Sequence, residues 1–396
     1  MAYRECATLE LIHGAMLGSM ALEIRENEHL PRGLPLLFLH SSKDLQEHII
    51  TADAQESTED KSIKEHREER LRLEFLHYSS MSANSTQDAF YFILTGIPGF
   101  EDCHIWISIP FCCFYIISII GNTAIYTVVH IEPSLHQPMY LFLSMLALTD
   151  LGLTLTTLPT IMGLFWFNIH KISFEACFAQ FFFLHGFSFM ESSVLLAMAF
   201  DRYVAICHPL RYASIFTNEI IGRVGFTIIC RCALAVLPSL FLLKRLPFCG
   251  SHLLSHSYCL HQDMIHLVCA DTQLNNWYGF ALVLLIIVMD PLLIVLSYAM
   301  ILRSVLRISS MTERLRALNN CLSHVLAVMT LYVPMVGVSM THRFVKHNSP
   351  LVHVIMANVY LLAPPVMNPI IYSVKTKQIR HGIIHLLCPH TVHSRK

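Results

Sequence analysis

Residues 198–207 read Met-Ala-Phe-Asp-Arg-Tyr-Val-Ala-Ile-Cys, and they close a long apolar run that begins at Phe174. The run contains Glu191 and exceeds the roughly 20 residues that an α-helix needs to cross a bilayer. Asp201 and Arg202 therefore stand at one end of a predicted membrane helix, where long charged side chains reach water or the headgroups. The stretch predicts a spanning helix with a charge pair at its mouth.

Six further apolar runs of similar length lie on either side of this one. They are too long for core helices of a soluble domain, and they lack the alternation of barrel strands. The sequence therefore predicts an all-α membrane protein, a seven-transmembrane helix bundle. The seven predicted spans are 105–129, 139–167, 174–200, 224–243, 277–302, 317–340 and 351–374.

The composition supports a chain solvated by lipid. Of 396 residues, 54% are hydrophobic and only 14% are charged, against about a quarter charged in soluble domains. This excludes a disordered chain and a nucleic-acid binder, and the 13 cysteines are too dispersed for a disulfide scaffold. Residues 1–80 differ from the rest, because they hold 15 acidic and 9 basic residues, whereas 81–396 hold 13 and 18. We therefore expect a charged, disordered extension at 1–80, an N-terminal segment at 81–104, the helical domain at 105–374 and a tail at 375–396.

The distribution of arginine predicts the orientation of the bundle. Cytosolic loops of membrane proteins carry an excess of Lys and Arg. Arg202, Arg211 and Arg223 follow span three, and basic residues also follow spans five and seven, although the opposite loops are not free of them. The balance places the N-terminus outside and the C-terminus in the cytosol. Asn84-Ser85-Thr86 would then be an outside glycosylation site at Asn84.

Polar residues inside the spans are costly in lipid and are candidates for function. Asn122, Asp150, Glu191 and Asn368 lie at similar depth in four different spans. One interpretation is a set of hydrogen bonds that hold the helices together, and the other is a proton- or sodium-linked switch. The sequence leaves both open.

Several motifs in fixed order resemble the rhodopsin-like G-protein-coupled receptors, and within them the olfactory receptors. The similarity covers residues 81–396 and includes two features that separate olfactory receptors from the wider superfamily. Tyr332 takes the place of the usual Trp two residues before Pro334, and span four has no Trp. The long outer loop and the run Lys375–Arg380 are similar to the class I, fish-like branch. The motifs are Gly121-Asn122, Pro138–Leu143, Leu146–Asp150, Met198–Cys207, Ser297-Tyr298, Arg316–His324 and Pro365–Tyr372.

The resemblance implies a receptor in the plasma membrane that binds a small-molecule odorant and activates a heterotrimeric G protein of the stimulatory, olfactory type through cyclic AMP. It implies a Cys177–Cys259 disulfide and leaves Cys249–Cys269 as a second pair within the outer loop. The residues expected to take part in G-protein coupling and switching are Asp201, Arg202, Tyr203, Tyr298, Asn368, Pro369 and Tyr372.

The outer halves of the spans supply candidate odorant contacts. Span three carries His185, Ser188 and Phe189, and a bridge at Cys259 would hold His261 and Gln262 over the mouth of the bundle. Span six adds Ser339 and Arg343, and Arg343 would suit a carboxylate, which favours small polar or acidic odorants. The competing interpretations are an interfacial anchor for Arg343 and an interhelical hydrogen bond for His185.

Three other functions are weaker. An enzyme with a metal site would need more than His381 and His385, which lack a third ligand nearby in sequence, so we expect no cofactor, no metal and no catalytic residue. A membrane transporter would show an internal repeat with paired broken helices, and we see neither. A non-olfactory chemosensory receptor of the same superfamily remains an alternative.

Overall fold

The computed structural model describes residues 91–97, 104–248, 252–344 and 350–387. All of them belong to one compact unit, Phe90–Lys396. The predicted extension 1–80 and the sequon at Asn84 lie outside the described residues.

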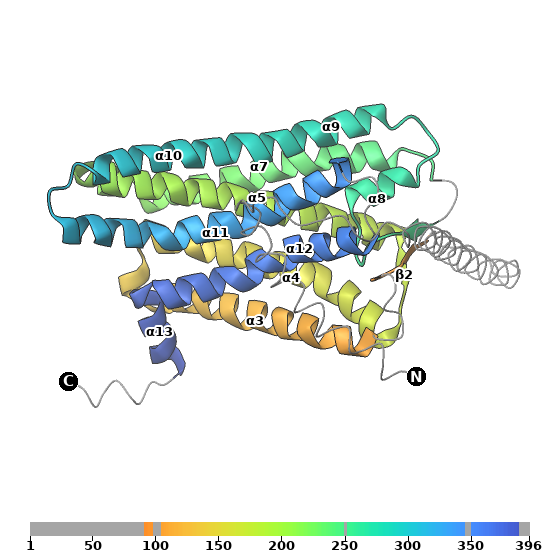
Figure 1. Ribbon diagram of the computed structural model, residues 1–396, viewed down its shortest axis with the longest axis horizontal. Coiled ribbons are helices and arrows are strands. Elements are labelled where there is room, and N and C mark those ends of the chain that lie inside the picture. The colour runs from red at the N-terminus through yellow and green to blue at the C-terminus, as the bar shows by residue number, and fades with distance from the viewer. Residues whose placement is uncertain (1–90, 98–103, 249–251, 345–349, 388–396) are drawn as a thin grey trace, which may run out of the picture. The chain divides into compact units, whose positions relative to one another are not determined.

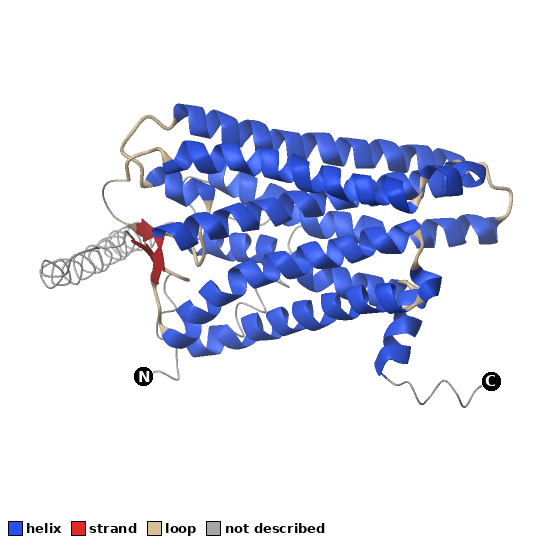
Figure 2. Cartoon of the chain, turned by 180° about the vertical axis from the view of Figure 1, so that it is seen from behind, coloured by secondary structure: helices blue, strands red, loops and turns tan. Residues whose placement is uncertain are grey.

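Seven helices in this part of the chain are long and apolar enough to span a membrane, which confirms the predicted bundle. Figures 1 and 2 show them running side by side. One of the seven is a continuous rod of α9 (Gln273–Leu284), a π-helical turn (η4, Leu285–Met289) and α10 (Asp290–Val305). The other six are α3 (His104–Ile131), α4 (Pro138–Phe167), α5 (Phe174–Cys207), α7 (Asn218–Lys244), α11 (Met311–Phe344) and α12 (Pro350–Lys375).

The helices are longer than the apolar runs that predicted them. α5 continues past Phe200 to Cys207, and α11 begins at Met311 rather than 317. An apolar run marks only the length that lipid covers, whereas backbone hydrogen bonding continues into the polar region beyond it. Asp201 and Arg202 therefore lie within the last two turns of α5.

Local sequence explains where several helices begin and end. Ser173 caps α5 by accepting a hydrogen bond from Ala176 N at 3.4 Å, and Thr217 caps α7 by accepting one from Ile220 N at the same distance. At the far end of α4, Asn168 adopts a left-handed conformation with φ 51°. Asn tolerates this conformation, and its N–H bonds back to Gly163 O, which closes the helix.

The core has two halves, which correspond to the two ends of α5. We call the end with the Cys177–Cys259 disulfide the disulfide end, and the end with Arg202 the Arg202 end. Phe92 and Phe181 belong to the buried cluster of the disulfide end, and Leu195 to that of the Arg202 end. Large apolar side chains on the outside remain exposed in the bundle, as expected where lipid is the solvent.

A small sheet lies at the disulfide end, which the sequence did not predict (Figure 2). Strand β1 (Tyr91–Leu94) pairs antiparallel with β2 (Lys171–Ser173) and parallel with β3 (Leu253–Leu254). The segment before the first span is therefore hydrogen-bonded to two loops of the bundle, and its residue Phe92 is fully buried. A four-residue strand carries too little alternation to be recognised in the sequence.

The π-helical turn in the α9–α10 rod stands directly before Asp290-Pro291. Proline has no backbone N–H and its ring clashes with the preceding turn, so a regular α-helix cannot continue through it undisturbed. A wider turn accommodates this disturbance without breaking the rod.

The chain bends after Thr376 into α13 (Lys377–Leu387), at the Arg202 end (Figure 1). Gly382 packs so closely on α3 that a β-carbon would overlap Val128. His385 Nδ1 lies 3.1 Å from Glu132 Oε1 just beyond the end of α3. The tail helix is therefore held against α3 by the close packing of Gly382 on the Val128 side chain and by one polar contact.

Candidate functional site

A cavity of about 500 Å³ lies in the disulfide-end half of the bundle. Its wall comes from α5, α7, the α9–α10 rod, α11 and α12, together with the short helix α8 (His261–His266) and the loop around it. Figure 1 shows α8 at the disulfide end beside the long helices. Among the described wall residues none carries a permanent charge, and the polar ones are His185, Ser239, Tyr258, His261, Gln262, His266, Thr272, Asn276 and Tyr360.

The structure brings most of the predicted odorant contacts to this cavity. His185, Phe189, His261 and Gln262 line it. Ser188 is buried and is not among the residues that line the cavity. The side chains of Ser339 and Arg343 lie outside the described part of the chain, so their roles remain predictions from the sequence.

Two imidazoles can exchange hydrogen bonds with a ligand. His185 is partly buried, its ring packs 4.8 Å from that of Phe181, and its buried Nε2 makes no hydrogen bond with the described residues. Exclusion of water lowers the pKa of His261 to about 4, so this side chain is neutral at physiological pH. A neutral imidazole both donates and accepts, which suits a hydroxyl, carbonyl or carboxyl group.

Gly279 of α9 gives His261 its place in the wall. A β-carbon at Gly279 would lie 3.1 Å from His261 Cε1, which is tighter than ordinary van der Waals contact. The ring of His261 lies 5.7 Å from that of Phe181 on its other neighbour, α5. The imidazole is thus located between two helices.

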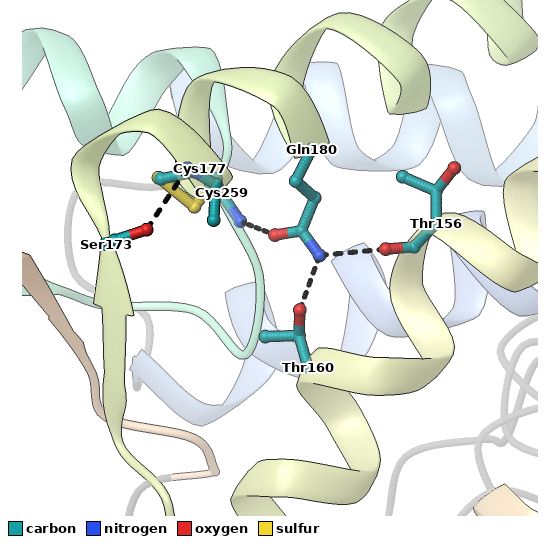
Figure 3. The surroundings of a disulfide bond; sticks show 7 residues. Thr156, Thr160, Ser173, Cys177, Gln180 and Cys259 are labelled. Atoms are coloured by element: carbon teal, nitrogen blue, oxygen red, sulfur yellow. Dashed lines mark hydrogen bonds between the residues drawn. A yellow bond between two sulfur atoms is a disulfide. The ribbon is translucent and has the colours of Figure 1, made fainter.

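The disulfide Cys177–Cys259, which the resemblance implied, is present in the structure and joins α5 to the loop that carries α8 (Figure 3). Its Cα atoms are 5.6 Å apart and both cysteines are fully buried. Cys269 is also disulfide-bonded, but Cys249 lies outside the described residues.

A polar network that the sequence did not predict lies next to the cavity, on the side toward the Arg202 end. Arg231 of α7 donates to Asp290 Oδ1 of α10 at 2.9 Å and to Ser193 Oγ of α5 at 2.8 Å. Ser192 donates to Asp290 Oδ2 at 2.7 Å, and its Oγ lies 2.8 Å from the Tyr332 hydroxyl of α11. We call these five residues the Arg231–Asp290 network. The sequence does contain a signal for this network, because spans four and five carry one residue each of opposite charge, Arg231 and Asp290.

The predicted polar cluster of the membrane core forms in part. Asn368 Nδ2 donates to Asp150 Oδ2 at 3.0 Å and to Glu191 Oε1 at 3.2 Å, so one amide bridges two buried carboxyl groups from α4 and α5. Asn122 donates instead to Pro365 O of α12 at 2.8 Å and to Ser118 O of its own helix at 2.9 Å. The hydrogen bonds supply the interhelical role, and the switch role remains a prediction.

Two of the predicted switch residues, Asp201 and Arg202, lie at the Arg202 end, whereas Asn368 belongs to the polar cluster just described. Asp201 Oδ1 accepts a 2.7 Å hydrogen bond from the Tyr212 hydroxyl of the short helix α6 (Tyr212–Ile215), while Arg202 contacts Met139 Sδ at the start of α4. Burial and the Asp201 carboxyl raise the pKa of Tyr212, so its hydroxyl keeps the proton that it donates. Tyr298, another predicted residue, lies 2.8 Å from His324 Nδ1.

Comparison with known proteins supports one family. Residues 111–390 match the family model described as "Olfactory receptor". The chain is 75% identical over 316 residues to human "Olfactory receptor 51Q1", which covers 80% of this chain and 100% of that relative. It is 56% identical over 318 residues to human "Olfactory receptor 51G2", with the same coverage, and 53% identical over 294 residues to human "Olfactory receptor 51L1", which covers 74% of this chain and 93% of that relative.

Proposed function

The chain belongs to the olfactory receptor family, and from this premise we propose that the cavity at the disulfide end is its odorant site and that the Arg202 end is its G-protein site. Receptors of this family are multi-pass plasma-membrane proteins, not enzymes, that bind small odorants and signal through heterotrimeric G proteins. The observation that carries the proposal is the cavity itself, because it unites an apolar wall with His185, His261 and Gln262.

The wall favours an odorant with an apolar body and one polar head. Phe181, Phe189 and the aliphatic residues of the rod would cover the body, and the imidazoles of His185 and His261 would form hydrogen bonds with the head. A small alcohol, carbonyl compound or acid meets this description. A panel of such odorants with a cyclic AMP readout tests the proposal, and the absence of any response in cells that display the receptor would contradict it.

The cavity is connected to the Arg231–Asp290 network through three helices. On α5 the wall residue Phe189 is three positions before Ser192, and on the rod Ile287 is three positions before Asp290. On α11 Met335 follows Tyr332 by three positions. An odorant that displaces the wall therefore acts within about one helical turn of the network. Its differential contacts would shift a pre-existing equilibrium between inactive and active bundles.

Filling the cavity should weaken every odorant. We expect Gly279→Leu to raise the half-maximal concentration about ten- to hundredfold, since overpacking costs about 1–3 kcal/mol and each 1.4 kcal/mol is tenfold. The new side chain would press on His261 and occupy the space that the ligand needs. Concentration–response curves at equal surface density measure the shift.

Gly222→Leu is the matched control for this substitution. A β-carbon at Gly222 on α7 has no neighbouring atom within 4 Å, so the same change there should leave potency unaltered. Equal potency in wild type and in Gly279→Leu would place the odorant elsewhere.

Arg202 should control coupling rather than binding. Because it lies at the opposite end of α5 from Cys177, its guanidinium does not reach the cavity. We expect Arg202→Ala to reduce maximal odorant-stimulated cyclic AMP at least about tenfold while odorant affinity changes only a few-fold. Arg223→Ala, which removes an exposed arginine paired with Glu219, should leave both unchanged. Loss of binding with intact coupling would contradict the assignment of the two ends.

A further inference from the structure

The carboxamide of Gln180 joins three elements next to the disulfide (Figure 3). Its Nε2 donates to Thr160 Oγ1 at 2.7 Å and to Thr156 O at 3.1 Å, both on α4. Its Oε1 accepts a hydrogen bond from Cys259 N at 2.9 Å. The side chain is only 6% exposed, so these bonds are made in a site from which water is largely excluded.

This arrangement holds Cys259 at two points with different effects. The disulfide to Cys177 limits the distance between two backbones, but it bonds only their side chains and leaves the peptide N–H of Cys259 without a partner of its own. The bond from Cys259 N to Gln180 fixes the direction of the loop backbone itself. Gln180 is in turn hydrogen-bonded to Thr160. The position of the loop is therefore set by α4 as well as by α5.

The loop segment that follows Cys259 enters the cavity wall almost at once. Leu260 stands directly before α8, and His261 and Gln262 are the first two residues of that helix. On the other side of Cys259, the Tyr258 hydroxyl donates to Ala357 O of α12 at 2.8 Å. A small rotation of the backbone at Cys259 would therefore displace the polar part of the wall.

We propose that Gln180 is a positioning residue of the receptor, which sets the place of α8 and so of His261 and Gln262 in the cavity wall. The significance for odorants rests on the proposed function, whereas the positioning itself does not. Without the carboxamide, Cys259 N–H would be buried and unpaired, and this favours states in which the loop moves toward water.

Labelling of a cysteine in α8 tests the proposal without any odorant. Ile265 lines the cavity and is 8% exposed, so Ile265→Cys places a shielded thiol on the inner side of α8. Intact cells are treated with a membrane-impermeant maleimide–biotin, and labelling is measured per surface receptor, with the receptor lacking Ile265→Cys as background. Gln180→Met, which keeps the length of the side chain without its hydrogen bonds, should raise the labelling rate about tenfold.

Substitutions at the anchor separate positioning from a general loss of packing. Thr160→Val removes the hydroxyl at nearly constant volume and should also raise the rate, whereas Thr160→Ser keeps the hydroxyl and should not. Gln137→Met, which alters an exposed glutamine before α4, should leave the rate unchanged. If Gln180→Met does not reach the surface, the two Thr160 variants decide the outcome.

An unchanged rate in Gln180→Met would overturn the proposal, as would equal rates in Thr160→Val and Thr160→Ser. Because labelling needs neither odorant nor G protein, a failure of the proposed odorant site shows only in the cyclic AMP panel, and the two failures remain distinguishable.

Discussion

Replacing Cys177 or Cys259 by alanine should remove nearly all receptor from the cell surface. The bridge joins residues 82 positions apart, and closing a loop of this size stabilises a folded chain by about 4.5 kcal/mol in the chain-entropy account. Net stabilities of proteins are about 5–15 kcal/mol, so losing this much stability would leave a large fraction of the receptor unfolded. Cells degrade unfolded receptor before it reaches the surface. Surface labelling of a tagged receptor measures the effect.

The double variant gives the sharper test of pairing. If the two sulfurs act only through one bond, Cys177→Ala/Cys259→Ala should be no worse than either single change. Cys113→Ala, at a free and exposed cysteine of α3, should leave surface display normal. Normal display of both single variants would show that the bridge is not required.

Removing one partner of the Arg231–Asp290 pair should be almost as damaging. Asp290→Ala leaves the Arg231 guanidinium at membrane depth without its carboxylate, and breaking a fully buried pair costs about 3–5 kcal/mol, an upper bound here because the Arg231 side chain is 34% exposed. The same change frees Ser192 from its hydrogen bond to Asp290, so α5 also loses a contact with the rod. We expect Asp290→Ala and Arg231→Ala each to lower surface level and thermal stability strongly.

The reciprocal prediction is partial rescue. Arg231→Met/Asp290→Leu replaces both charges by apolar side chains, and such replacements are often neutral in stability. The double variant should recover surface level but not full signalling, because Ser192 and Tyr332 would keep only their mutual bond. The exposed pair Glu219–Arg223 is the control, and Glu219→Ala should change stability by less than about 1 kcal/mol. A double variant as unstable as the singles would contradict this account.

The sequence predicted the bundle well because the membrane imposes a length on every span. Runs such as 105–129 and 351–374 can be recognised without knowledge of any contact, and all seven correspond to helices. The family was likewise readable, since its motifs occur in order at fixed spacing, and the comparisons confirm it. The spans and the family could therefore be predicted from the sequence alone.

Contacts that depend on how a helix is rotated were not readable. Arg231 and Asp290 were visible as isolated charges, but their pairing requires both helices to turn the right face toward α5. Gln180 gave no signal, because a glutamine near a helix end is ordinary until its three partners are known. The sheet at β1 depends on three short segments that meet only in the folded chain.

The π-helical turn between α9 and α10 changes which side of the rod the residues beyond it face. One extra residue per turn shifts the angular position of everything beyond it by about 100° relative to a regular helix. This offset lets one continuous rod direct Asn276 and Gly279 toward the cavity and Asp290 toward Arg231. Deleting a single residue from Leu285–Met289 would give a more regular helix that could satisfy only one of these two faces. The segment is therefore intolerant of changes in length even where it accepts changes in side chain.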